Sequence, residues 1–108
     1  MVRYPCAYYG AEVELADDRE RHIAGRHPEL VPDLRRVIAE TLASPDLVRR
    51  SGRHPGARMV TRWFEWLLGG KHVVVVVMSQ ESPRQRHWVV TAYATRRLAK
   101  GASEWRRS

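Results

Sequence analysis

Two short helices are predicted in the first half of the chain from the spacing of its apolar and polar residues. Asp17 and Glu20 have the spacing of a capping box, which predicts a helix over residues 18–26. Pro28 disfavours helical geometry in the residue before it and therefore ends this helix. Apolar residues then recur at helical spacing over residues 32–43, which predicts a second helix that begins at a proline.

The period changes to two in the second half of the chain, where strands are predicted at 47–50, 59–68, 71–79 and 86–97. The last two strands are separated by a short break and are expected to pair antiparallel. Residues 1–15 fit either a short hairpin or a loosely extended arm, and the tail after residue 97 is expected to be frayed.

This order of elements predicts an α+β fold in which two N-terminal helices pack on one face of a four-stranded antiparallel sheet. With 108 residues the chain is long enough for a single hydrophobic core. One domain is therefore expected over residues 1–108, with its core at about 15–98 and loose termini.

The last predicted strand alternates in chemistry as well as in hydrophobicity. Successive side chains of a strand point to opposite faces, so Trp88, Val90 and Ala92 are expected to pack beneath the helix at 32–43. The opposite face is expected to lie away from both helices and to carry His87, Val89, Thr91, Tyr93 and Thr95. Such a face is either a site for phosphate or RNA or a solvated surface that β-propensity alone explains.

The chain is strongly basic, with 19 Lys and Arg residues against 12 Asp and Glu residues, a net charge of +7. Nearly all the basic residues are arginine, the side chain suited to bidentate phosphate contacts and to stacking on bases. High genomic GC content would explain arginine in place of lysine, but it does not explain the excess of positive charge. A polyanionic partner is therefore expected.

Other features narrow the class of protein. No apolar run has the ~20 residues that a membrane helix needs, and the first residues lack the apolar core of a signal peptide. Cys6 is the single cysteine, which excludes an intramolecular disulfide and a cysteine-rich zinc site. These features favour a cytoplasmic protein without a membrane partner.

A cluster of imidazole and guanidinium groups lies at the end of the first predicted helix. His22 and Arg26 are four residues apart on one helix face, and Pro28 directs His27 out of the helix toward the same space. Histidines suit general acid–base chemistry near neutral pH, although a histidine at a helix C-terminus is also a common cap. The two histidines lack the spacing of a zincin motif, so no metal site is expected.

Several short segments together resemble a known family. They are His22-Ile-x-x-Arg26-His27-Pro28-Glu29-Leu30, Val37-Ile-x-x-Thr41-Leu-x-x-Pro45-Asp46-x-Val48, Val73–Val77 and Val90-Thr91-Ala92-Tyr93-x-Thr95. Over roughly residues 20–97 this pattern is similar to the phage-associated branch of the barnase/EndoU/colicin/RelE-like ribonuclease superfamily. Members are typically small, metal-independent ribonucleases, often toxins or phage effectors, with one or two helices before a four-stranded antiparallel sheet.

The resemblance implies an endoribonuclease without a cofactor that cleaves RNA through its 2′-hydroxyl group, which DNA lacks. Its catalytic residues are expected to be His22, His27, Thr91 and Tyr93, with His22 as the base and His27 or His87 protonating the leaving group. Substrate contacts are expected from Arg26, Arg53, Lys71 and His87. Arg53 lies in the basic, turn-rich loop at 51–56.

A non-catalytic protein is the main alternative: an RNA-binding module, or one half of a toxin–antitoxin-type pair. Exposed arginines suffice for salt-dependent binding without chemistry. In the toxin case the partner is an acidic antitoxin or immunity protein. Trp63, Trp66 and Trp88 are candidates for stacking on a base, although strand tryptophans more commonly pack in the core.

Overall fold

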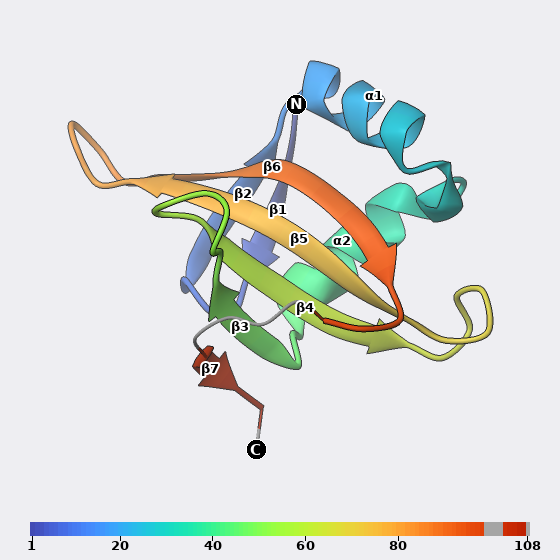
Figure 1. The fold of residues 1–108 in the computed structure, drawn as a ribbon. Helices are drawn as coiled ribbons and strands as arrows, with labels where there is room; N and C mark the ends of the chain where they lie inside the picture. Colours follow the sequence, from blue (N-terminus) through green and yellow to red (C-terminus); the bar gives the residue numbers. More distant parts are fainter. Residues whose placement is uncertain (99–102, 108) are drawn as a thin grey trace.

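Within the residues that the structure describes, the chain forms one seven-stranded sheet, and two α-helices cover part of it (Figure 1). The computed structural model describes residues 1–98 and 103–107. The strands lie in the order β1-β2-β6-β5-β4-β3-β7, and every neighbouring pair is antiparallel except β2 with β6. The strands are β1 (Val2–Cys6), β2 (Ala11–Leu15), β3 (Leu47–Arg50), β4 (Arg58–Phe64), β5 (Lys71–Gln80), β6 (Arg86–Thr95) and β7 (Ser103–Arg106).

The predicted four-stranded antiparallel sheet with two N-terminal helices is therefore wrong, because the sheet is larger and mixed. Residues 1–15 form the β1–β2 hairpin, which precedes the helices and joins the sheet through the parallel pair Glu14–Trp88. At the other edge, β7 pairs with β3, although a frayed tail was expected. All four β7 residues are exposed and show no alternation, so the sequence pattern carried no signal for this strand.

The helices are α1 (Asp17–Arg26) and α2 (Leu34–Ala43), separated by the 3₁₀ turn η1 (Pro28–Leu30). Both lie within two residues of their predicted bounds. No helix of the described residues has the length and apolar character needed to cross a membrane. Three apolar residues of α2 are fully buried against the sheet, as the helical spacing predicted: Val37, Ile38 and Leu42.

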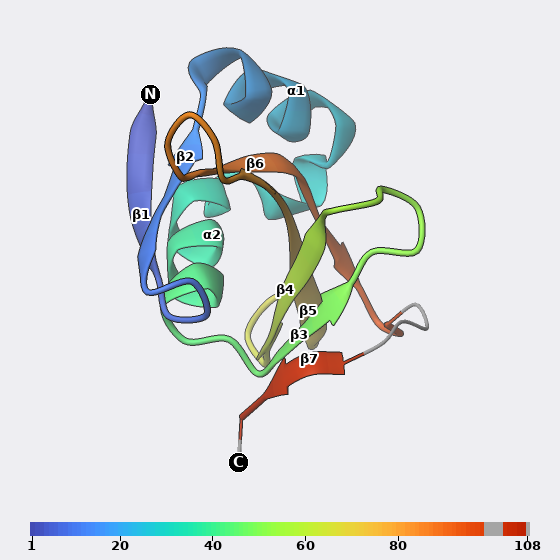
Figure 2. The ribbon, with the colours of Figure 1, turned by 90° about the vertical axis from the view of Figure 1, so that its left-hand side faces the viewer.

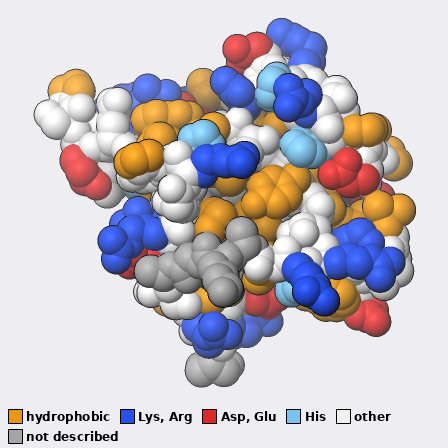
Figure 3. All heavy atoms as spheres, in the orientation of Figure 1, with side chains coloured by type: hydrophobic (Ala, Val, Ile, Leu, Met, Phe, Trp, Pro, Cys, Tyr) orange, Lys and Arg blue, Asp and Glu red, His pale blue; other side chains and the backbone are white. Residues whose placement is uncertain are grey.

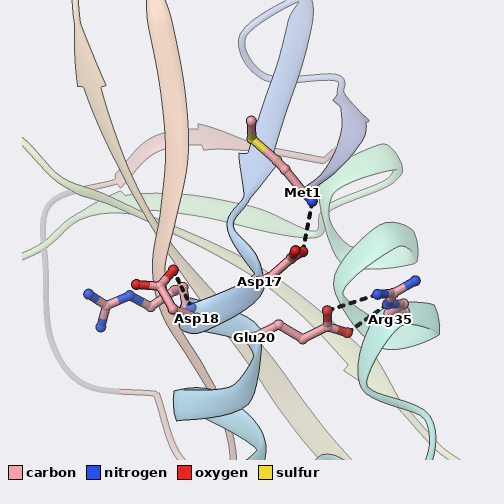
Figure 4. Close-up of polar contacts among 6 residues, drawn as sticks. Met1, Asp17, Asp18, Glu20 and Arg35 are labelled. Atoms are coloured by element: carbon pink, nitrogen blue, oxygen red, sulfur yellow. Dashed lines mark hydrogen bonds and ion pairs between the residues drawn. The ribbon is translucent and has the colours of Figure 1, made fainter.

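The predicted capping box of α1 does not form. Ala16 occupies the cap position, and the Asp17 carboxylate instead accepts a hydrogen bond of 2.7 Å from the amino group of Met1 (Figure 4). Glu20 turns toward α2 and accepts two hydrogen bonds, of 2.6 and 2.9 Å, from the Arg35 guanidinium. Both carboxylates therefore bind positively charged groups on neighbouring elements instead of capping the backbone amides of α1.

The core lies between α2 and one face of the sheet. It includes the valines of β5 at alternate positions, Val73, Val75 and Val77. The intervening residues Val74 and Val76 face the other side of the sheet and form a smaller cluster. Figure 2 shows α2 on one side of the central strands, while the loop between β3 and β4 projects on the other side. We call this second side the open face.

A β-bulge in β6 changes which face of the sheet the side chains of this strand occupy. Val77 pairs with Val89 and Val76 pairs with Thr91, so Val90 is an extra residue. The bulge shifts the alternation, so that Val89 and Ala92 both belong to the core cluster that also holds the buried residues of α2. Val90 packs instead with the open-face cluster.

The predicted faces of β6 are therefore partly wrong. The strict alternation placed His87 and Val89 with Thr91, whereas the bulge puts them on opposite faces. Of the three residues expected beneath the helix at 32–43, Ala92 alone belongs to the core cluster on that side of the sheet. Thr91 and Tyr93 do face away from α2, but the end of α1 lies beside them.

Candidate functional site

A hollow of about 620 Å³ opens on the open face and is bordered by three segments that are distant in sequence. The end of α1 and the residue after it form one side, the β3–β4 loop forms another, and β4, β5 and β6 form the floor. The lining residues are His22, Arg26, His27, Ser51, Gly52, Arg53, His54, Met59, Val76, Thr91 and Tyr93. Figure 3 shows histidine and Lys or Arg side chains gathered on the upper part of this face around hydrophobic groups.

Local features of the chain fix the position of each side of the hollow. His22 and Arg26 lie one helical turn apart on α1, whose Ile23 is fully buried in the core and fixes how the helix turns its faces. The helix ends at Arg26, where the His27 amide donates 2.7 Å to the Ile23 carbonyl. His27 then leaves the helical path with φ −131° and ψ 65° and enters the hollow.

The β3–β4 loop is held by Ser51. Its hydroxyl accepts hydrogen bonds from the backbone amides of Arg53, at 3.2 Å, and of His54, at 3.0 Å. Gly56 has a φ of +85°, in the region that favours glycine, and lets the chain turn back into β4. The loop is thereby folded so that the exposed residues Arg53 and His54 border the hollow.

His27 contacts two groups at the site. Its Nδ1 lies 3.4 Å from Glu29 Oε2, a contact that becomes an ion pair whenever the ring carries a proton on both nitrogens. Its ring lies 6.0 Å from the Tyr93 ring, centroid to centroid, at an angle of 39°. The Nε2 atom is the ring nitrogen that Glu29 does not engage.

The border of the hollow is cationic. No acidic residue is among the described residues that line it. The salt bridges found within residues 1–98 and 103–107 use six arginines, none of which lines the hollow. Arg26 and Arg53 are both exposed at the border. A further guanidinium, that of Arg49, is 6% exposed and lies in the sheet next to the lining residue Met59.

Six of the eight predicted site residues therefore meet at one hollow: His22, Arg26, His27, Arg53, Thr91 and Tyr93. Sequence reasoning missed Ser51 and His54, although their loop was singled out as basic and rich in turns. His54 is adjacent to Arg53, but nothing in the local pattern showed that the loop folds toward α1.

The other two predicted site residues lie elsewhere. Lys71 pairs with the core residue Phe64 on the α2 side of the sheet, and its Nζ donates 3.3 Å to the Leu68 carbonyl. His87 is 3% exposed and stacks on Tyr9 with the ring centroids 4.0 Å apart, while its Nδ1 lies 2.7 Å from Ser79 Oγ. Burial lowers the pKa of His87 below the usual 6.5. Both residues lie on the core side of the sheet, away from the hollow.

The described residues include no group of three or more His, Cys, Asp or Glu side chains arranged to hold a metal ion. The chemistry that the hollow itself offers is proton transfer by imidazoles, hydrogen bonding by hydroxyl groups and stabilisation of negative charge by guanidinium groups.

Comparison of the chain with protein-family models, with curated proteins and with solved structures finds no match.

Proposed function

We propose that this protein is a metal-independent endoribonuclease whose active site is the hollow between α1, the β3–β4 loop and the open face. The observation that carries the proposal is the convergence of three imidazoles, two guanidinium groups and three hydroxyl groups from separate segments on one cavity. RNA cleavage by the 2′-hydroxyl requires a base, an acid and positive charge around the phosphate. The resemblance to ribonucleases over residues 20–97 supports the same activity.

In the proposed reaction His22 accepts the proton of the 2′-hydroxyl while its oxygen attacks the adjacent phosphorus. A 2′,3′-cyclic phosphate forms and the bond from phosphorus to the 5′-oxygen breaks. Protonated His27, ion-paired with Glu29, supplies the proton that the leaving 5′-oxygen takes up. Each proton and electron pair is thereby accounted for without a further reactant.

The remaining lining residues stabilise the transition state. Arg26 and Arg53 neutralise the charge that builds up on the phosphoryl oxygens, because a guanidinium donates paired hydrogen bonds to phosphate. Thr91 and Tyr93 donate hydroxyl hydrogen bonds from the floor of the hollow. His54 is a second candidate for the acid, since it borders the same cavity.

The net charge of +7 also favours a second function, binding of RNA without cleavage. The same cationic border would hold the phosphate backbone electrostatically. It would equally accept an acidic inhibitor protein of the kind that accompanies toxins. We place either activity in the cytoplasm, where RNA is available.

The test is incubation of the purified protein with labelled single-stranded RNA in EDTA. We expect fragments that end in 2′,3′-cyclic phosphate and no cleavage of DNA of the same sequence. His22→Ala and His27→Ala should each lower cleavage by about 10²–10⁴-fold and leave RNA binding nearly unchanged.

The matched control is Arg21→Ala, since Arg21 precedes His22 but lines a different hollow together with Arg35. This variant should cleave RNA nearly as fast as the wild type. The nuclease proposal fails if the wild-type protein leaves RNA intact with and without EDTA. Binding of RNA under the same conditions would then identify the protein as a binding module.

A further inference from the structure

Trp63 lies on the same face of the sheet as the proposed active site. It pairs with His72 across β4 and β5, and His72 pairs with Thr95 of β6. Val74 lies two residues from His72 in β5, and Tyr93 lies two residues from Thr95 in β6. These two residues pair and pack together on the open face. Paired residues share a face and every second residue returns to it, so Trp63 and Tyr93 point to the same side.

The Trp63 indole is held in place although it is 39% exposed. Its Nε1 donates a 2.6 Å hydrogen bond to Glu65 Oε2, and its ring meets the His72 ring edge-on at 4.8 Å. Its benzo edge lies so close to Gly70 that a Cβ there would come within 2.5 Å of Cζ2. Because these contacts already fix the ring, the side chain loses little conformational entropy when a flat ligand stacks on it.

The neighbourhood of Trp63 suits a polyanion that extends away from the hollow. Arg96 and Arg97 follow directly on Thr95, and both are exposed. Neither arginine takes part in a salt bridge within the described parts of the chain. Figure 3 shows a further histidine lower on this face, apart from the upper group, with Lys or Arg side chains near it.

We infer that the substrate is a single-stranded RNA that crosses the open face, and that Trp63 stacks on the base of a nucleotide next to those flanking the scissile bond. The inference rests on the proposed function. Strand spacing and rise place Trp63 roughly 12 Å from Tyr93, too far for the base at the scissile bond. A single strand is required because only unpaired bases expose their faces to an aromatic side chain.

The other tryptophans do not offer the same platform. Trp105 of β7 is similarly exposed, at 38%, but it pairs with Val48, a residue of the α2-side core, and therefore lies on the opposite side of the sheet. Trp66 comes from the same hairpin but packs on Phe64, a residue of the α2-side core, and the Arg36 guanidinium covers its ring at 4.5 Å. Trp88 is half-buried with the Arg86 guanidinium 5.3 Å from its ring centroid. Trp66 is therefore the matched control for Trp63, since it is similarly exposed but lies on the opposite side of the sheet.

The first experiment measures binding without cleavage. A 2′-O-methyl RNA oligonucleotide, which cannot be cleaved by this mechanism, is bound to wild-type protein, Trp63→Ala and Trp66→Ala. Trp63→Ala should bind about 5- to 150-fold more weakly, the range that follows from losing one base stack. Trp66→Ala should bind like the wild type, and Trp63→Phe should recover part of the loss.

The stacked base is located by a series of oligonucleotides, each with one abasic position. One position should weaken binding to the wild-type protein and have no further effect on Trp63→Ala, as expected for two groups that form one contact. Additive losses at every position would overturn the inference, as would equal affinities of Trp63→Ala and the wild type.

A second experiment separates this inference from the nuclease proposal. Trp63→Ala should lower kcat/KM for a long oligonucleotide but not for a dinucleotide, which cannot reach Trp63. An equal loss on both substrates would overturn the stacking role. If no RNA is cleaved but binding still depends on Trp63 and one base, the nuclease proposal fails and the strand-binding face remains.

Discussion

The rings of His27 and Tyr93 lie 6.0 Å apart, centroid to centroid, although one follows the first helix and the other belongs to the sixth strand. Tyr93 extends from the floor of the hollow, and His27 enters it from the side. The pair joins a titratable group to a hydroxyl group at a cationic cavity. This geometry connects the fold to the proposed chemistry, because neither element forms the site alone.

Tyr93→Phe should lower RNA cleavage by about 10²–10³-fold, the range for losing one hydrogen-bond donor to a developing oxyanion. The ring and its packing against His27 are retained, so urea unfolding should change little. Cleavage rates under single-turnover conditions provide the measurement. Cleavage at the wild-type rate would show that the hydroxyl group does not contact the reacting phosphate.

Arg26→Ala and Arg53→Ala should each weaken RNA binding and flatten its dependence on salt. Losing one phosphate contact to a single strand reduces the slope of log K against log salt by about 0.7. Titrations at several salt concentrations measure this slope. Arg36→Ala is the control, since Arg36 stacks on Trp66 and pairs with Glu40 on the α2 side, and its slope should match that of the wild type.

Stability should fall in acid partly because of His87. Burial lowers its pKa below the 6.5 of the exposed residue, so the unfolded chain binds a proton more readily than the folded one. The free energy of unfolding is therefore expected to fall as the pH drops below about 6.5. Urea unfolding at a series of pH values should show a smaller fall for His87→Gln.

For each protein, the free energy of unfolding at lower pH is compared with its value at pH 8. At pH 8 His87 is neutral in both the folded and the unfolded state, so its protonation does not affect stability there. His72 also has a pKa lowered mainly by burial, so the variant should retain part of the pH dependence. Parallel curves for the variant and the wild type would contradict this role of His87.

Gly70→Ala should displace Trp63 and weaken binding of the 2′-O-methyl oligonucleotide. A Cβ at Gly70 would overlap the indole, whereas one at Gly69 would meet nothing within 4 Å. Both glycines have positive φ, +105° and +76°, so Gly69→Ala introduces backbone strain without the clash. A loss of affinity in Gly69→Ala equal to that in Gly70→Ala would show that strain alone is responsible.

Periodicity placed both helices and the central strands close to their observed positions because each buries a stripe or face of its own residues, but it extended β4 to residue 68 although this strand ends at Phe64. Val37, Ile38 and Leu42 show this for α2, and Val73–Val77 for β5. It missed β7, whose residues are all exposed. It also could not choose between a hairpin and an arm for residues 1–15, because the pairing of β2 with β6 joins residues far apart in the chain.

Residue chemistry alone was enough to single out the histidines at the end of the first helix, the basic loop and the hydroxyl groups of the last long strand. Only the tertiary structure determined which of them meet. The bulge at Val90 separates Thr91 and Tyr93 from His87, because one inserted residue reverses the faces of a strand. The fold of the loop held by Ser51 brings Arg53 and His54 opposite α1. Such long-range placement depends on packing between distant segments, which no local pattern of residues encodes.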